Sequence, residues 1–191
     1  MEMAMAQRDP EEYTYADYLS WAEADRIQII DGEAVVMQAA PSRKHQQVLT
    51  NLMLQLGNYL AGKNCKVYPA PFAVTLDEEG LPDDEIKTVV EPDITVICDP
   101  SKLTERGCSG APDMIVEILS PTTARIDQII KFNKYLQCGV KEYWIVDPET
   151  KVVLTYLLQN GKYVASAYGE SRKVKVQVLS DCLIDLSKIF E

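Results

Sequence analysis

Apolar and polar residues recur with helical spacing in three parts of the chain and with strand spacing in most of the rest. Helical spacing covers residues 13–24, 42–61 and 123–139, with Thr14 and Ser42 placed as N-caps and Gly139 as a stop signal. Strand-like runs cover residues 65–76, 88–99, 112–119, 141–148 and 172–180. The dipeptides Asp31-Gly32 and Asn160-Gly161 each separate two apolar runs, which predicts two β-hairpins. A short helix over residues 183–190 is expected to close the chain.

This order of elements predicts a mixed α/β (α+β) domain with one central mixed sheet flanked by helices. An N-terminal helix and hairpin precede the sheet, and an antiparallel tail follows it. At 191 residues the chain suits one domain, residues 1–191, of which residues 1–12 are expected to be a flexible N-terminus. In the helix over residues 123–139, the spacing places Ile126, Ile129, Ile130 and Leu136 on the apolar side.

A carboxylate interrupts one of the most apolar runs, the stretch "PDMIVEIL", where Glu117 stands between Val116 and Ile118. Burying an unpaired ionised carboxylate costs several kcal/mol, so Glu117 should be protonated, paired with a cation or bound to a metal. Alternation along the strand places Asp113 on the same face as Glu117, but four residues span roughly 13 Å at 3.3 Å per residue. One metal ion therefore cannot bind both carboxylates.

The preceding apolar run, "VVEPDITVICD", holds a second embedded carboxylate, Asp93. Adjacent strands lie about 4.8 Å apart, so Asp93 and Glu117 can share one divalent cation if their register allows. Two carboxylates, a backbone carbonyl and waters suit Mg²⁺ or Mn²⁺. In the alternative reading Lys131 or Lys134 neutralises Glu117, and Asp127 with Lys131 is an ordinary i, i+4 helical pair. Spacing does not separate that structural role from a catalytic lysine that orients a water beside the metal.

Composition narrows the classes of function. The net charge of -10 gives no basic footprint for nonspecific nucleic-acid binding, although six acidic residues fall in the predicted solvated loop 76–85. Five cysteines, odd in number and without a CxxC pair, predict reduced thiols in a cytoplasmic protein. No apolar run approaches twenty residues, and the first residues lack the features of a signal peptide, so we expect a protein that is neither membrane-bound nor exported. The aromatic residues Tyr135, Tyr143 and Trp144 are expected to pack in the core.

Several segments resemble the Uma-two family of restriction-endonuclease-like proteins, which belongs to the PD-(D/E)xK nuclease superfamily. The similar segments include "IIDGEAVVM", "APSRKHQQVLTNLMLQL", "VEPDITVI" and the long run from "APDMIVEILSPTT" to "GVKEYWIVDPE". The resemblance extends from about Tyr13 to Phe190, and the ordered pair "VEILSPTT" and "GVKEYWIVDP" is highly specific.

This resemblance implies a magnesium-dependent phosphodiesterase site at a sheet flanked by helices. Position by position, Asp93 matches the motif aspartate, Glu117 the motif glutamate, and Lys131 the lysine that the family places on the helix. The family pattern also has a histidine at the position of His45. This residue has either a phosphate-binding or metal-proximal role, or it is only a partly exposed residue at the start of a helix. Gln46, next to it, is a further accessory candidate.

The chain departs from the usual superfamily pattern in three places. The lysine that normally follows the glutamate by two residues is Leu119 here, so the lysine has to come from the helix. The segment 42–63 has no acidic residue to supply the usual helical glutamate, for which Glu33 on the hairpin is the candidate substitute. Family members often read "ELIDGE" where this chain reads "QIIDGE", so that Gln28 replaces a carboxylate.

Two hypotheses follow from the sequence. In the first, the protein is a metal-dependent endonuclease that hydrolyses nucleic acid, with DNA as the expected substrate and a homodimer as a compatible arrangement that places two sites on one duplex. In the second, a nuclease-like fold serves as a binding or regulatory module, which the acidic charge and Gln28 favour.

Overall fold

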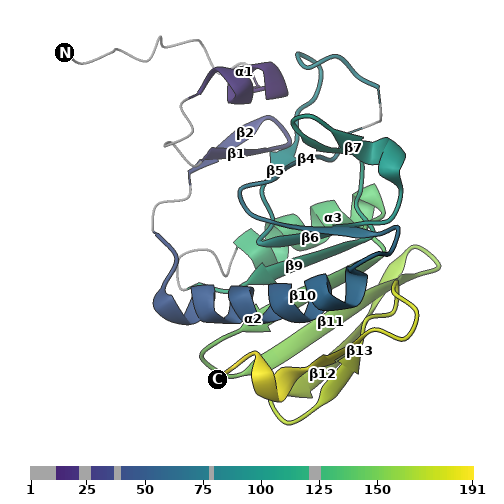
Figure 1. Cartoon of the computed structure of the whole chain (residues 1–191). Coiled ribbons are helices and arrows are strands. Elements are labelled where there is room, and N and C mark those ends of the chain that lie inside the picture. The colour runs from purple at the N-terminus through teal and green to yellow at the C-terminus, as the bar shows by residue number, and fades with distance from the viewer. Residues whose placement is uncertain (1–11, 22–26, 37–39, 78–79, 121–125) are drawn as a thin grey trace.

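A central six-stranded sheet organises the chain in the computed structural model, which describes residues 12–21, 27–36, 40–77, 80–120 and 126–191 (Figure 1). β9 and β10 run parallel, and every other neighbouring pair in this sheet is antiparallel. In spatial order the strands are β12 (Lys162–Gly169), β11 (Val152–Gln159), β10 (Glu142–Asp147), β9 (Met114–Ile118), β6 (Ile94–Ile97) and β3 (Lys66–Pro69).

A second six-stranded sheet was not expected from the sequence. The predicted strands 65–76 and 88–99 each break in two, and each contributes one strand to the central sheet and one to this second sheet. Short strands in the segment between residues 103 and 109 complete it. In spatial order it contains β2 (Glu33–Val36), β1 (Ile27–Ile30), β5 (Val89–Val90), β4 (Ala73–Thr75), β8 (Gly107–Ser109) and β7 (Leu103–Thr104).

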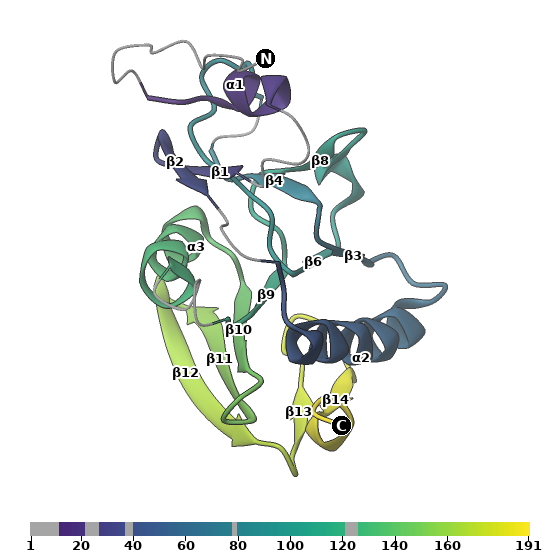
Figure 2. The ribbon, with the colours of Figure 1, turned by 90° about the vertical axis from the view of Figure 1, so that its left-hand side faces the viewer.

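Helices cover both faces of the central sheet, as Figure 2 shows with the sheet between α2 (Arg43–Leu60) and α3 (Phe132–Cys138). A six-residue π-helix, Ile126–Lys131, leads directly into α3, and α1 (Tyr15–Ser20) packs beside the hairpin of β1 and β2. The mixed α/β fold predicted from the sequence is confirmed. Within the described residues, no helix combines the length and apolar character that a membrane span needs.

The two faces of the central sheet bury different apolar clusters. The inner side of α2 packs on one face of β6, β9 and β10, because residues four apart share one side of a helix. The buried residues of that layer include Val48, Leu52, Leu56, Leu60, Ile94, Val96, Met114, Val116, Ile118, Trp144 and Val146. On the other face, Tyr135 of α3 packs with Ile115, Tyr143 and Ile145. Alternation along β9 therefore confirms that Ile115 and Glu117 point away from α2.

Turn and cap signals confirm several predicted boundaries. Asp31 and Gly32 have φ angles of 51° and 81°, and Asn160 and Gly161 have φ angles of 49° and 75°, as two-residue type I′ hairpins require. The Ser42 hydroxyl accepts a hydrogen bond from the His45 amide at 3.1 Å and caps α2. Gly139 ends α3 in the left-handed conformation. Residues 1–11, 22–24 and 123–125 of the predicted segments lie outside the described residues.

The predicted closing helix over residues 183–190 is wrong for its first half. Residues Leu183–Asp185 form strand β14, which pairs with β13 (Lys173–Lys175), and only Leu186–Lys188 form a single 3₁₀ turn. Strand pairing is favoured over a helix here because it buries Ile184 against the apolar side of α2, where Ile189 is also buried. The antiparallel character of the C-terminal tail is confirmed.

The apolar side predicted for the segment before α3 is wrong at Ile129 and Ile130, whereas Ile126 packs against the core as predicted. Ile129 and Ile130 are 54% and 43% exposed, whereas Asp127 and Lys131 are 2% and 1% exposed. The π-helix turns two charged side chains inward and two isoleucines outward, which reverses the usual arrangement of an amphipathic helix. The inward groups must therefore be compensated by partners inside the protein.

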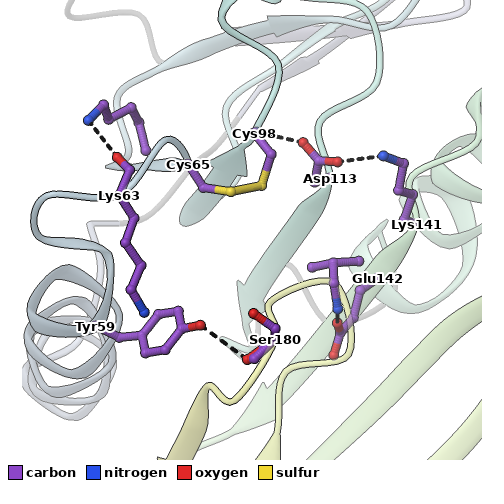
Figure 3. The surroundings of a disulfide bond; sticks show 10 residues. Tyr59, Lys63, Cys65, Cys98, Asp113, Lys141, Glu142 and Ser180 are labelled. Atoms are coloured by element: carbon purple, nitrogen blue, oxygen red, sulfur yellow. Dashed lines mark hydrogen bonds and ion pairs between the residues drawn. A yellow bond between two sulfur atoms is a disulfide. The ribbon is translucent and has the colours of Figure 1, made fainter.

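The cysteines were expected to be reduced thiols, and two of them are not. Cys65 and Cys98, directly opposite each other at the ends of β3 and β6, form a disulfide (Figure 3). Beside it, the Cys98 amide donates to Asp113 Oδ2 at 2.7 Å, and Lys141 Nζ donates to Asp113 Oδ1 at 2.6 Å. The sequence could not anticipate the pair, because 33 residues separate two cysteines that only strand pairing brings together.

We predict that replacing both Cys65 and Cys98 with serine lowers the free energy of unfolding by about 4 kcal/mol, because the bond closes a loop of 33 residues in the unfolded chain. Urea unfolding under non-reducing conditions measures the loss, and Cys138→Ser, which removes a free thiol, should leave stability close to wild type. Titration of the denatured, unreduced protein should find three free thiols. A count of five would contradict the disulfide.

Candidate active site

Glu117 lies near the end of β9 with its carboxylate enclosed by the helical segment on that face. Only 3% of the residue is exposed. Its Oε1 atom accepts hydrogen bonds from Lys131 Nζ at 2.8 Å and from the Tyr135 hydroxyl at 2.7 Å. The ion pair alone does not offset the loss of water, so the second donor, Tyr135, supplies part of the compensation that a buried charge needs.

The π-helix supplies a second carboxylate to the same ammonium group. Asp127 Oδ1 lies 3.4 Å from Lys131 Nζ, and both side chains are almost fully buried. The backbone carbonyl of Asp127 accepts a hydrogen bond from the Tyr143 hydroxyl at 3.0 Å, which ties the π-helix to β10. Lys131 is thus held between two acidic side chains from two different elements.

Asp93 immediately precedes β6 and faces Glu117 across the strand pair. Ile94 pairs with Val116 in antiparallel register, and one further step along that register sets Asp93 opposite Glu117. Asp93 Oδ2 accepts a hydrogen bond from the Ile118 amide at 2.7 Å, so the side chain takes the place of a ladder acceptor at the strand end. The register required for two neighbouring carboxylates is present.

His45, in the first turn of α2, contacts the carboxylate of Asp93. Its Nε2 atom lies 3.2 Å from Asp93 Oδ2, and its Nδ1 atom lies 3.1 Å from Gln46 Oε1. Because both ring nitrogens face oxygen acceptors, this arrangement favours the imidazolium form. Burial alone would lower the pKa of His45, but the hydrogen bond to Asp93 and the charge of that carboxylate raise it above its ordinary value.

The acidic side chains in this cluster outnumber the one side chain that is always positively charged, Lys131. Three carboxylates, those of Asp93, Glu117 and Asp127, surround one ammonium group and one histidine. Burial raises the pKa of Glu117 above its ordinary value, and the charges of Asp127 and Asp93 add to that effect, while the ammonium group of Lys131 at 2.8 Å lowers it and favours the ionised form. The same carboxylates raise the pKa of Lys131 above its ordinary value despite burial, which opposes them. Lys131 therefore stays charged, and an added cation near Glu117 and Asp93 would relieve the repulsion.

The donor atoms suit a hard divalent cation, although they do not form a complete protein shell. The hydrogen bonds described above use only Oδ2 of Asp93 and Oε1 of Glu117, and the second oxygen of each carboxylate takes no part in them. Among the described residues, no three histidine, cysteine or acidic side chains are grouped so as to hold a metal ion. An ion at Asp93 and Glu117 would complete its shell with backbone carbonyl, water or phosphate oxygens, as Mg²⁺ commonly does.

The structure brings together five of the residues singled out in the sequence: Asp93, Glu117, Lys131, His45 and Gln46. Glu33 is exposed on β2, outside the hydrogen bonds that join the others. Gln28 is buried in β1, and its Oε1 atom has no hydrogen-bond partner among the described residues.

The structure also shows the partners of Lys134 and Asp113, the two other polar residues that the sequence placed near Glu117. Lys134 pairs with Asp31 in the hairpin turn and does not neutralise Glu117. Asp113, on the same face of the strand as Glu117, has its own partners in Lys141 and the Cys98 amide.

Sequence reasoning missed two members of the cluster. Asp127 was interpreted only as part of an ordinary helical ion pair, and Tyr135 only as a core aromatic. Both are almost fully buried, and both contact the pair formed by Glu117 and Lys131. A signal was present, because Asp127, Lys131 and Tyr135 recur every four residues and so fall on one side of a helical segment.

Three comparisons relate the chain to known proteins. The Uma2 family model, described as "Putative restriction endonuclease", matches residues 15–186. The "Uncharacterized protein slr1290" of Synechocystis sp. is 23% identical over 165 residues, which cover 84% of this chain and 83% of that protein. A crystal structure described as a putative nuclease belonging to DUF820, from Anabaena variabilis, superposes with a TM-score of 0.73 at 19% identity. That match covers 93% of this chain and 97% of the other, and it supports the nuclease-like fold.

We predict that Tyr135→Phe destabilises the protein by about 2 kcal/mol, because it removes one of two donors to a buried carboxylate and bonds to charged groups contribute more than neutral ones. Tyr143→Phe is the matched control, since its hydroxyl donates to a neutral backbone carbonyl in the same aromatic cluster. That variant should lose about 1 kcal/mol. Urea unfolding at neutral pH compares them, and equal losses would argue against an ionised Glu117.

Proposed function

Because the chain belongs to the Uma2 family, we propose that this nuclease-like protein is a metal-dependent endonuclease that hydrolyses phosphodiester bonds in DNA. The observation that carries the proposal is the buried pair of Glu117 and Lys131 beside Asp93, in which a lysine adjoins two carboxylates able to share a cation. Asp127 and His45 add a third and a fourth ionisable group at the same place, and such clusters of perturbed ionisable groups are typical of functional sites.

Asp93 and Glu117 are the residues that would hold Mg²⁺ or Mn²⁺, because each has a carboxylate oxygen that takes no part in the described hydrogen bonds. The bound ion would supply Lewis acidity, lowering the pKa of a coordinated water and offsetting charge on the phosphate. His45 and the Ile118 amide fix Asp93 through Oδ2, and Lys131 and Tyr135 fix Glu117 through Oε1. Both carboxylates are therefore oriented before substrate arrives.

Lys131 has the chemistry to act on the attacking water and the phosphate. Its ammonium group stays charged between Glu117 and Asp127, so it can hydrogen-bond a water and offset the negative charge that develops on the phosphate. Asp127 Oδ1 lies 3.4 Å from the same ammonium group, in addition to the contact that Lys131 makes with Glu117 of β9. The lysine reaches this position from a helical segment, which supports the role that the family resemblance implies for Lys131.

DNA binding by a chain with a net charge of -10 requires a local arrangement, because the protein as a whole repels phosphate. The bound cation and Lys131 provide positive charge at the scissile phosphate, while Arg43 and Lys44 lie two residues or fewer from His45 at the start of α2. A homodimer would present two such sites to one duplex.

A second candidate function is a nuclease-like binding or regulatory module without activity. Gln28 favours it, because a buried amide oxygen without a hydrogen-bond partner among the described residues stands where relatives often have a carboxylate. Calorimetric titration with Mg²⁺ separates the two candidates. An intact fold that binds no metal at millimolar concentration would support the module.

We predict that Mg²⁺ raises the thermal unfolding midpoint of the wild-type protein, because a cation that binds only the folded state relieves repulsion among three buried or half-buried carboxylates. At a free concentration of 100 times the dissociation constant, the stabilisation should be about 2.7 kcal/mol. Differential scanning calorimetry with and without the ion measures the shift. Asp113→Asn is the control, since that carboxylate is outside the cluster and should leave the shift intact, whereas no shift in the wild type would oppose a shared metal site.

We predict that Glu117→Gln abolishes magnesium-dependent cleavage of DNA while leaving the circular dichroism spectrum near wild type, because the amide keeps size and an acceptor oxygen but loses the charge. Lys131→Ala should lower the cleavage rate by at least about a hundredfold and retain metal binding, since the lysine is proposed to act on water and phosphate.

The matched control for the lysine is Lys134→Ala, which removes an ammonium group from the next helical turn, where it pairs with Asp31. It should cleave nearly as fast as wild type. Equal losses in the two lysine variants would mean that both supply only a general positive field, and a Glu117→Gln variant with the wild-type rate would rule out the assignment of this site.

A further inference from the structure

The edge of the central sheet at β12 is unusual for a strand that faces solvent. β12 has eight residues, whereas β3, at the opposite edge, has four residues, begins with Lys66 and ends with Pro69. Figure 2 shows β12 along the outer margin of the sheet. Proteins normally protect such edges with short strands, proline or inward charges, and between Lys162 and Gly169 β12 has none of these.

Hairpin geometry determines which backbone groups of β12 face outward. The type I′ turn at Asn160-Gly161 makes Gln159 and Lys162 a hydrogen-bonded pair, so every second residue from Lys162 onward bonds to β11. The residues between them direct their backbone groups outward, and these are Tyr163, Ala165, Ala167 and Gly169. The side chains of Val164, Ala165, Ser166 and Ala167 are all exposed, so nothing in the described structure covers this stretch.

We propose that β12 pairs with β12 of a second copy of this chain, in antiparallel register about a two-fold axis through Ser166. The two central sheets then become one continuous sheet. In this register Ala165 lies opposite Ala167 of the other copy, and Tyr163 lies opposite Gly169, so that outward-facing residues meet one another and exchange hydrogen bonds. The Gly169 carbonyl already accepts a bond from the Arg172 amide, so the end pair relies on the Gly169 N–H group.

Side-chain complementarity selects this register over the neighbouring one centred on Ala165, which also matches outward residues. Centred on Ser166, the pairing brings Lys162 towards Glu170 of the other copy, the turn residue that follows β12 and pairs with Lys151 of its own chain at 2.6 Å, so each end of the interface adds a second lysine to that carboxylate. It also sets Val164, which is 50% exposed in one copy, against Tyr168, and an aromatic residue opposite a β-branched one is a favourable cross-strand pair. The register centred on Ala165 sets Lys162 against Tyr168 and leaves the charges of Lys162 and Glu170 apart.

Light scattering after size-exclusion chromatography tests the interface without metal or nucleic acid, so its outcome is independent of the proposed catalytic function. The wild-type chain, 21.4 kDa per copy, should elute as a dimer. Ser166→Lys should be monomeric at the same concentration, because it places two like charges against each other on the axis. The matched control is Thr155→Lys, which adds the same charge on the paired residue of β11 and should remain dimeric.

Cysteine cross-linking then tests the register. Ser166→Cys should form a covalent dimer under mild oxidation, because the residues on the axis form a non-hydrogen-bonded pair whose Cα atoms approach to about 4.5 Å. Ala165→Cys should not. A wild-type chain that stays monomeric, a dimer that Ser166→Lys leaves intact, or cross-linking by Ala165→Cys in place of Ser166→Cys would each overturn the proposal.

Discussion

An ammonium group almost completely removed from water, between Glu117 and Asp127, is the interaction on which the rest of the site depends. Neither partner could stay charged in this position alone, because desolvation of an ion costs several kcal/mol. Each charge is therefore bound to at least one other. The π-helix turns Asp127 and Lys131 inward and leaves two isoleucines exposed. The need to pair these buried charges explains this arrangement.

The same requirement extends through the sheet to its other face. Asp93 is hydrogen-bonded both to the Ile118 amide of the neighbouring strand and to His45 of α2, so it connects a helix on one face to the carboxylate that points to the other. Charged groups from α2, β9 and the π-helix thus converge where β6 and β9 lie side by side. A displacement of either helix would disturb the balance of charge at Glu117.

The sequence predicted those parts of the fold that depend on local signals. Turn dipeptides placed both hairpins, Ser42 placed the start of α2, and the alternation around Glu117 assigned its face correctly. The sequence did not predict which segments far apart in the chain pair with one another. The division of residues 65–76 and 88–99 between two sheets, the pairing of β14 with β13, and the disulfide all depend on contacts between segments that are far apart in sequence.

The sequence predicted that Asp93, Glu117 and Lys131 lie close together, but it did not predict how the groups around them are arranged. Asp93 and Glu117 could be placed near each other because neighbouring strands have a fixed spacing, and Lys131 came from resemblance to a family. Spacing alone did not show that the Tyr135 hydroxyl and the Asp127 carboxylate complete the cluster. A polar residue in a helix can face the core or the solvent, and the sequence does not distinguish the two unless its partners are known.

The disulfide has a consequence for proteolysis. Cys65 and Cys98 lie on either side of the acidic loop, in which Asp84 and Glu85 are exposed and therefore accessible to a protease. A single cut in that loop separates the chain into two pieces in sequence, but the bond between β3 and β6 still joins them. The nicked protein would migrate as one molecule without reductant and as two fragments once the disulfide is reduced.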